Sequence, residues 1–251
     1  MNEQGPSPAG EADRLRAVLE HHERLSQLGK MAAGIAHEVG NPLAAISSIV
    51  QTLLAQSQEE SARERLLLVK EQVGRITAII RQLVEYSRPS SERPRPLDMN
   101  EVARDAARLM RYEPRARGVD LTLELDDRLP AALGQPHQVQ QLFLNLLHNA
   151  LDATEGRPWR AVRVRSRREG DWAVFTIEDN GKGMAPELLA RVFDPFFTTK
   201  EPGRGTGLGL WICKGIAAAL PGELELSSTE GQGTTATLRT RIFHAPEHPG
   251  R

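Results

Sequence analysis

The segment LSQLGKMAAGIAHEVGNPLAAISSIVQTL, residues 25–53, decides the fold of the first part of the chain. Its apolar residues recur at alternating steps of three and four, with one step of seven, which is the heptad seam of a helix that packs against other helices. The seam residues are Leu25, Leu28, Ala32, Ile35, Val39, Ile46, Ile49 and Leu53. The pattern predicts one long helix from about residue 11 to residue 56.

A second helix is predicted after the polar break at residues 57–61. Ser57 with Glu60, and Ser61 with Glu64, each match the capping box that starts a helix. The apolar seam of this helix repeats the same spacing, through Leu66, Val69, Val73, Ile76, Ile80 and Leu83. Two seamed helices joined by a short turn predict a helical hairpin.

The apolar stripe of this hairpin is wide, because Leu67, Ile79 and Val84 flank the seam. Pairing two hairpins into a four-helix bundle would bury the stripe. We therefore expect a homodimer built on such a bundle. A hairpin that packs on its own chain is the alternative.

The face opposite the seam carries polar side chains that could take part in a reaction. In this register His37 lies at position f, Glu38 lies beside it, and Asn41 lies one turn further on the same side. An exposed imidazole next to a carboxylate can act as a nucleophile, because the acid holds the proton of one ring nitrogen while the other attacks. A single surface histidine usually has no such role. Pro42 favours a catalytic role for His37, because a proline inside a helix costs stability. Departures of this kind from the usual sequence preferences are expected near functional sites.

The rest of the chain has a different pattern. Proline, serine and arginine crowd residues 88–97 and predict a linker. Helices are predicted at 100–111, 136–153 and 208–220, and strands at 119–125, 161–165, 173–177, 223–226 and 234–240. This mixture predicts an α+β chain, in which the hairpin is followed by an α/β sandwich with helices on one face of a mixed sheet. The expected parts are a disordered start at 1–10, the hairpin domain at 11–87, the linker, the sandwich domain at 98–243 and a disordered tail at 244–251.

Two asparagines, Asn145 and Asn149, share one face of the predicted 136–153 helix. Asparagine is a poor residue for a helix interior, so two aligned ones indicate a site. Their amide oxygens can bind Mg²⁺ and their NH₂ groups can meet phosphate oxygens. A solvated polar face is the alternative.

Glycine-rich segments follow the strand predicted at 173–177. In Asp179-Asn-Gly181-Lys-Gly183-Met184, the carboxylate can accept a hydrogen bond from an adenine amino group, and glycines let the backbone approach the base. A plain tight turn is the alternative. The loop Gly203-Arg-Gly205-Thr-Gly207-Leu-Gly209-Leu210 opens a helix and offers N–H groups to phosphates. No strand runs into it and it lacks the Lys-Ser/Thr ending, so it fits neither a dinucleotide fingerprint nor a P-loop.

In their order and spacing these motifs resemble those of sensor histidine kinases. The run Gly34-Ile-Ala-His-Glu-Val-Gly-Asn-Pro-Leu43 is similar to the H-box of the H-E-x-x-N-P type. The Asn145–Ala153 segment resembles the N-box, and the segments from Asp179, Phe193 and Gly203 resemble the G1, F and G2 boxes. These boxes belong to an ATP-binding domain shared with gyrase, Hsp90 and MutL. The resemblance covers about residues 25–241.

The resemblance implies a role for each matching residue. His37 would accept the phosphate, Glu38 would orient it or act as its base, and Asn41 would position water for dephosphorylation of a partner. Residues 193–203 would form a lid over the nucleotide, with Lys200 reaching the phosphates. Mg²⁺ would be held by Asn149, with Asn145 as a second ligand. The ATP-binding set would be Asn145, Asn149, Asp152, Asp179, Gly181, Gly183, Met184, Phe193, Thr199, Lys200, Gly203, Gly205, Thr206, Gly207, Leu208 and Gly209.

The implied reaction is ATP-dependent phosphorylation of His37, followed by transfer to an aspartate on the receiver domain of a response regulator. Net charge is −1 with no basic tract, so no nucleic-acid partner is expected. No apolar run approaches the ~20 residues that span a bilayer, and the start does not read as a signal peptide. With a single cysteine, Cys213, these features favour the cytoplasm. The stimulus would come from an upstream partner or through the first helix.

Two other functions compete with this one. A related ATPase without a phospho-histidine, or a serine kinase, would need neither the exposed His-Glu pair nor the Asn-Pro after it. A non-enzymatic dimeric scaffold with an inactive nucleotide domain would show decayed glycine loops or lost asparagines. Here both features are intact.

Overall fold

The computed structural model describes residue 39 and residues 43–57, 59–87, 94–201, 205–220 and 222–244. The chain divides into two compact units, residues 1–89 with 196–208, and residues 90–195 with 209–251. Each unit is described by itself. His37, Glu38, Asn41 and Gly203 lie outside the described residues, as do the predicted ends at 1–10 and 245–251 and most of the linker.

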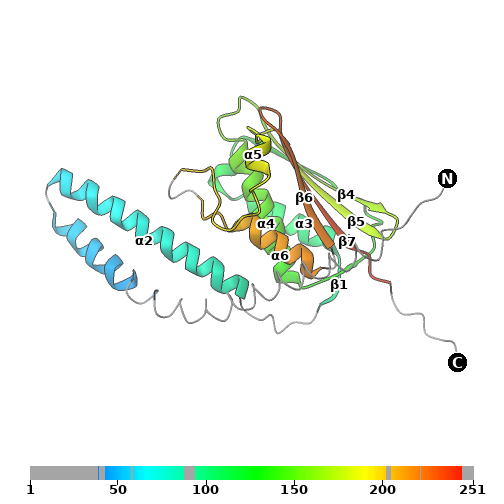
Figure 1. Cartoon of the computed structure of the whole chain (residues 1–251), viewed down its shortest axis with the longest axis horizontal. Coiled ribbons are helices and arrows are strands. Elements are labelled where there is room, and N and C mark those ends of the chain that lie inside the picture. The colour runs from blue at the N-terminus through cyan, green and yellow to red at the C-terminus, as the bar shows by residue number, and fades with distance from the viewer. Residues whose placement is uncertain are drawn as a thin grey trace. The chain divides into compact units, whose positions relative to one another are not determined.

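The first unit contains two helices, at residues 43–56 and at α2 (Glu60–Ser87), separated by a short break (Figure 1). The Nη1 of Arg63 donates to the carbonyl of Leu54 at 2.9 Å. This guanidinium therefore satisfies a carbonyl at the end of the first helix, which has no partner inside the helix. The helix break was predicted at this place, and the turn is held by a residue of the second helix.

The two predicted capping boxes are wrong in detail. Helix α2 begins at Glu60, between the starts that the two boxes imply. The hydroxyl of Ser61 bonds to the carboxylate of Glu59, and the hydroxyl of Ser57 reaches the carbonyl of Glu59 at 3.4 Å. Both serines are therefore engaged by Glu59 instead of by backbone N–H groups of the helix.

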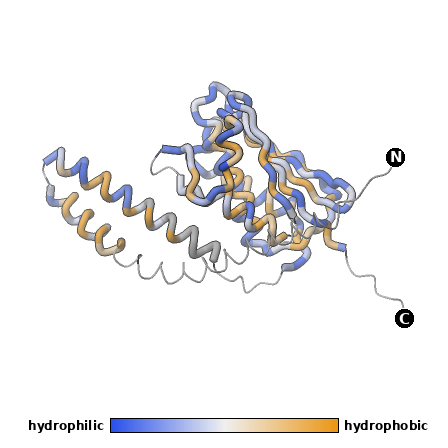
Figure 2. Tube along the Cα trace, viewed as in Figure 1, coloured by the Kyte–Doolittle hydropathy of each residue, from blue (hydrophilic) through white to orange (hydrophobic). Residues whose placement is uncertain are grey.

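Large apolar side chains stay exposed on the hairpin when the chain is taken alone. Leu43, Val50 and Val73 are buried, and Figure 2 shows apolar residues recurring along both helices. The exposed ones, between 41% and 60% accessible, are Ile46, Ile49, Leu53, Leu67, Leu68, Val69 and Ile76. We call these the exposed hairpin residues. Five of them belong to the predicted seam, so much of that seam is not used within the hairpin.

The second unit is a sandwich of one sheet and one helical layer. The sheet has the order β2-β4-β5-β7-β6, with β2 parallel to β4 and the other neighbours antiparallel. Its strands are β2 (Val119–Glu124), β4 (Arg160–Glu169), β5 (Trp172–Asp179), β6 (Gly222–Thr229) and β7 (Gly233–Arg241). The helices α3 (Met99–Met110), α4 (Pro136–Ala153) and α6 (Gly209–Ala219) cover one face (Figure 1). The predicted α+β class is confirmed.

The smaller elements were not predicted. They are β1 (Arg95–Leu97), η1 (Pro114–Ala116), β3 (Ala132–Gly134) and α5 (Pro186–Leu189). Strand β1 pairs antiparallel with β3, so residues 95–97 of the predicted linker form part of the folded unit. This strand was not predicted because Pro96 lies at its centre, and a proline-rich segment is usually interpreted as a linker.

The core of the second unit lies between α4 and the sheet. Strand β4 alternates, with Val162, Val164 and Ser166 buried and arginines between them. The ring of Phe143 on α4 meets the ring of Phe175 on β5 edge-on, with centroids 5.3 Å apart. This contact fixes α4, which carries both candidate asparagines, against the centre of the sheet.

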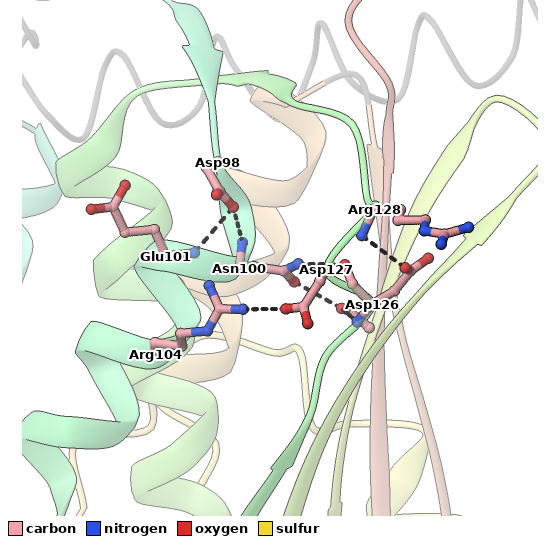
Figure 3. Close-up of polar contacts among 8 residues, drawn as sticks. Asp98, Asn100, Glu101, Arg104, Asp126, Asp127 and Arg128 are labelled. Carbon is pink, nitrogen blue, oxygen red and sulfur yellow. Dashed lines mark hydrogen bonds and ion pairs between the residues drawn. The ribbon is translucent and has the colours of Figure 1, made fainter.

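A buried polar ring fixes the start of α3 (Figure 3). Asp98 caps the helix by accepting from the N–H groups of Asn100 and Glu101, at 2.8 and 3.1 Å. The Asn100 side chain donates to the carbonyl of Asp126 and accepts from the hydroxyl of Ser166, which in turn accepts from the N–H of Asp126. The ring ties α3 to the end of β2 and to β4, so every buried polar atom in it has a partner.

No helix in the described part of the chain has both the length and the apolar character needed to cross a membrane.

Candidate active site

The carboxylate of Asp179 is held in place at the end of β5. Its Oδ1 accepts hydrogen bonds from the N–H groups of Gly181, at 2.8 Å, and Thr234, at 3.3 Å. Burial raises the pKa of this carboxyl to about 6, and the two backbone hydrogen bonds oppose that rise. A fixed, partly buried carboxylate of this kind suits recognition of an amino group on a ligand.

The loop after Asp179 is pressed between α4 and the turn that joins β6 to β7. The N–H of Lys182 donates to the carbonyl of Ala153 at 2.9 Å, and its own carbonyl accepts from Gly231 at 2.7 Å. A Cβ at Gly181 would overlap the carbonyl of Ala153, and one at Gly183 would overlap the backbone of Thr229. Gly183 also has a φ of +63°, which side chains rarely tolerate. Glycine is therefore required twice for this close approach.

Two residues that lock the loop were missed from the sequence. Asn180 accepts from the N–H of Ala161 and donates to the carbonyl of Trp159, each at 2.9 Å. The Nε of Arg157 donates to the carbonyl of Asn180 at 2.9 Å. Their partners lie about twenty residues away in the sequence, so only the pairing of β4 with β5 brings them together.

The two candidate asparagines meet the first residue of α6. A Cβ built on Gly209 would lie 4.0 Å from Cγ of Asn145 and 4.0 Å from Nδ2 of Asn149. The N-terminus of a helix carries partial positive charge and N–H groups without partners inside the helix. Amide side chains next to such a terminus form a setting that suits phosphate oxygens.

Asn145 also forms a hydrogen bond with Cys213 on α6. Burial raises the pKa of this thiol to about 12, and its hydrogen bond with Asn145 opposes the rise. The Sγ lies 3.7 Å from the carbonyl of Leu142. Cys213 is therefore a buried neutral thiol that packs α6 against α4.

Asp152 lies one turn beyond Asn149 on α4 and forms an ion pair. Its Oδ1 is 2.9 Å from Nη1 of Arg115, and its side chain is 18% exposed. Asp152 belongs to the ATP-binding set expected from the sequence. In the structure a cation from η1 already neutralises it.

The glycine-rich loop belongs to the unit that contains the hairpin and is described by itself. Thr198 Oγ1 accepts from the N–H of Lys200 at 3.2 Å, and Thr206 Oγ1 accepts from the N–H of Leu208 at 3.3 Å. A Cβ at Gly207 would overlap the backbone of Phe196, and the Gly207 φ is +69°. The loop is thus folded back on itself, and Thr199 and Gly205 lie within it.

Phe193 and Met184 lie in the sandwich unit. The Nζ of Lys214 on α6 is 5.0 Å from the centroid of the Phe193 ring. The N–H of Met184 donates to Oγ of Ser228 on β6 at 2.9 Å. These contacts fix both ends of the segment that joins the Asp179 loop to the predicted lid.

The donor set suits a magnesium ion that arrives with a nucleotide. The described residues contain no group of three or more His, Cys, Asp or Glu side chains that could hold a metal ion alone. Mg²⁺ commonly takes one or two protein ligands and completes its shell with phosphate oxygens and water. The amide oxygens of Asn149 and Asn145 fit that pattern.

Comparisons with known proteins match both parts of the chain. Residues 134–243 match the family described as histidine kinase-, DNA gyrase B-, and HSP90-like ATPase. Residues 27–92, which include His37, match the His Kinase A (phospho-acceptor) domain.

Individual relatives agree with these matches. The chain is 36% identical over 217 residues to the signal transduction histidine-protein kinase AtoS of Escherichia coli (strain K12), a match that covers 86% of this chain and 35% of AtoS. It is 34% identical over 219 residues to the C4-dicarboxylate transport sensor protein DctB of Pseudomonas aeruginosa, covering 86% of this chain and 36% of DctB. The chain therefore spans about a third of the length of these two relatives.

Solved structures share the fold. Full-length ShkA in complex with AMPPNP superposes with a TM-score of 0.65 at 25% identity, covering 86% of this chain and 47% of ShkA. The complex of histidine kinase ThkA with the response regulator protein TrrA gives a TM-score of 0.63 at 22% identity, covering 96% of this chain and 68% of that one.

Proposed function

The chain belongs to the sensor histidine kinases and carries their ATP-binding domain, and on this premise we propose that it moves the γ-phosphate of ATP onto its own His37. One observation supports this proposal most strongly. The Asp179 loop is pressed onto the end of α4, the same helix that brings Asn145 and Asn149 against the start of α6. Helix α4 thus positions both an acceptor for the adenine amino group and donors for the phosphates.

The nucleotide would lie between the Asp179 loop, α4 and the start of α6. Asp179 accepts the hydrogen bond of the adenine amino group, and Gly181 and Gly183 let the loop that carries Asp179 pack closely against α4 and Thr229. Asn149, with Asn145, would hold Mg²⁺, which when bound neutralises negative charge on the phosphates. The remaining members of the predicted set, from Asp152 to Gly209, would line the nucleotide or close over it, with Lys200 as the cation of the lid.

The chemistry at His37 needs a free electron pair on one ring nitrogen. Glu38 accepts a hydrogen bond from the protonated ring nitrogen and so keeps the other nitrogen as the nucleophile. That nitrogen attacks the γ-phosphorus in line, the bond to the β–γ bridging oxygen breaks, and ADP leaves. The product is a phosphoramidate at His37.

Transfer to an aspartate of a response-regulator receiver domain would complete the cycle. The fold shared with ThkA, which was solved together with the regulator TrrA, supports this partner. The exposed hairpin residues support a homodimer, because a second hairpin would cover them. We assign the hairpin domain to 11–87, the linker to 88–94 instead of the expected 88–97, and the catalytic domain to 95–243 instead of 98–243, because β1 pairs with β3. We also assign the protein to the cytoplasm.

Replacing His37 tests the proposal. His37→Gln should abolish self-phosphorylation and leave ATP affinity near the wild-type value, because the phosphate acceptor is separate in sequence from the nucleotide motifs. His137→Gln, which removes an exposed histidine at the start of α4, is the matched control and should keep both activities. Phosphate that still accumulates on His37→Gln at the wild-type level would overturn the assignment.

We also propose that Asn41 supports dephosphorylation of the regulator. An amide on the same face as His37 can orient a water toward a phospho-aspartate without acting as the nucleophile. Asn41→Ala should therefore lower regulator dephosphorylation while sparing much of the kinase step. A parallel fall of both activities and of the melting temperature would instead mean that Asn41 only shapes the helix before Pro42.

A further inference from the structure

One face of α4 carries three polar side chains in line. Asn145, Asn149 and Asp152 follow one another at steps of four and three, so they form a single stripe along the helix. The first two are the proposed ligands of magnesium and phosphate. Asp152 lies one turn beyond Asn149, where neighbouring side chains have Cβ atoms only about 5–6 Å apart.

A bare carboxylate at Asp152 would work against this site. The phosphate chain of ATP carries several negative charges, and like charges at this range repel one another. Arg115 removes the conflict, because its Nη1 lies 2.9 Å from the Asp152 carboxylate. The pair places a guanidinium at the end of the stripe that holds the asparagines.

The backbone around Arg115 is anchored to the same helix. Nη2 of Arg160 donates to the carbonyl of Arg115 at 2.9 Å and to that of Leu151 on α4 at 3.3 Å. Its Nη1 donates to the carbonyl of Arg117 at 3.1 Å, and its Nε to Oγ1 of Thr154 at 3.3 Å. Arg160 thus holds the segment that bears Arg115 against the end of α4, so the backbone of Arg115 is fixed in position.

The Arg115 side chain has donors available for a ligand. Its side chain is 47% exposed, and within the described residues its guanidinium makes one hydrogen bond, to Asp152. A guanidinium has five N–H donors arranged for bidentate contact with phosphate. Its second acidic neighbour, Glu113, lies 3.8 Å from Nε, which is beyond hydrogen-bond range.

We propose that Arg115 is a further nucleotide-binding residue, which contacts the phosphate chain from the α4 side while Asp152 holds it in position. The residue lies outside both family matches, which cover 27–92 and 134–243. The inference rests on the proposed function, because it takes the ligand of the α4 stripe to be ATP.

Binding of ATP, ADP and adenosine, each with Mg²⁺, to the full chain tests this role. Arg115→Gln should weaken ATP and ADP binding at least about tenfold and leave adenosine binding unchanged, because adenosine has no phosphate. Arg115→Lys should keep part of the affinity, since it retains the charge and loses the bidentate geometry. The matched control is Arg104→Gln, which removes a 48% exposed arginine paired with Asp127 at the same 2.9 Å, and it should change none of the three affinities.

A second substitution separates a phosphate contact from a structural role. Adding Asp152→Asn to Arg115→Gln should recover part of the lost ATP affinity, because it removes a carboxylate left uncompensated beside the phosphates. Equal loss of ATP, ADP and adenosine binding with a lower melting temperature would overturn the proposal in favour of a structural ion pair. Unchanged affinities in Arg115→Gln would overturn it too. A wild-type chain that binds no ATP would overturn the proposed function, and this inference with it.

Discussion

Asp179 is the residue whose environment is most clearly arranged for a ligand. Its pKa of about 6 lies above the ordinary value for a carboxyl because burial disfavours the charged form. Such a group costs stability in the free protein above that pH, and costs of this kind concentrate at functional sites. The two backbone N–H groups that bind its Oδ1 keep it oriented in either state.

Adenosine affinity should therefore fall as the pH drops through about 6, because protonation of Asp179 removes the charged acceptor of the adenine amino group. Adenosine is the suitable probe, since it has no phosphate that titrates in this range. Asp179→Asn should bind adenosine weakly at every pH, without a transition near 6. An unchanged affinity in that variant, or a flat profile in the wild type, would exclude Asp179 as the acceptor.

Stability should change with pH in the opposite direction. The folded pKa lies above the unfolded value, so the folded chain keeps its proton between about pH 4 and 6 while the unfolded chain loses it. The contribution of Asp179 to stability thus falls as the pH rises through this window. Melting temperatures of Asp179→Asn relative to the wild type should rise over the same window.

The roles of single residues could be predicted from the sequence where those roles depend on spacing along the chain. The glycines after Asp179 were expected to let the backbone approach a base, whereas in the structure they let it approach Ala153 and the backbone of Thr229. Asn180 and Arg115 were missed, because their partners come from distant strands and helices. Nothing in the local sequence pairs Arg115 with Asp152, which lies 37 residues later.

At the scale of elements, the hairpin exposes the side chains that its sequence pattern assigns to a seam. Ile49 is 60% exposed, although it belongs to that pattern. Exposed large apolar side chains in this number are a common mark of an interface. Helix α2 was predicted because periodicity is strong over many turns, whereas most of the first predicted helix lies outside the described residues. Strands β1 and β3 were missed because three residues are too few to show a period.

Ile49→Glu should therefore disrupt the homodimer, because it places a charge among the exposed hairpin residues. Light scattering should give the wild type twice the chain mass of 27.7 kDa and give the variant a mass nearer one chain. Leu109→Glu is the matched control, since Leu109 is a 47% exposed leucine on α3. A monomeric wild type, or a variant that stays fully dimeric, would contradict the bundle.

At the scale of the whole molecule, the chain matches a phospho-acceptor domain and an ATP-binding domain, and the proposed function requires the two to meet. The sequence indicated both, because the two sets of motifs occur in the family order. The proposed delivery of phosphate from one domain to the other is a property that spacing along the chain does not encode. On the proposed function, the product of that meeting is a phosphate on a histidine.

The chemical stability of the attached phosphate tests this claim most directly. The full chain is incubated with Mg²⁺ and ATP radiolabelled in its γ-phosphate, and the labelled protein is then treated with acid or with base. A phosphoramidate is labile in acid and stable in base, so we expect label that acid removes and base leaves in place. Label that survives acid, as a phosphate ester of serine or threonine does, or a chain that takes up no label, would contradict it.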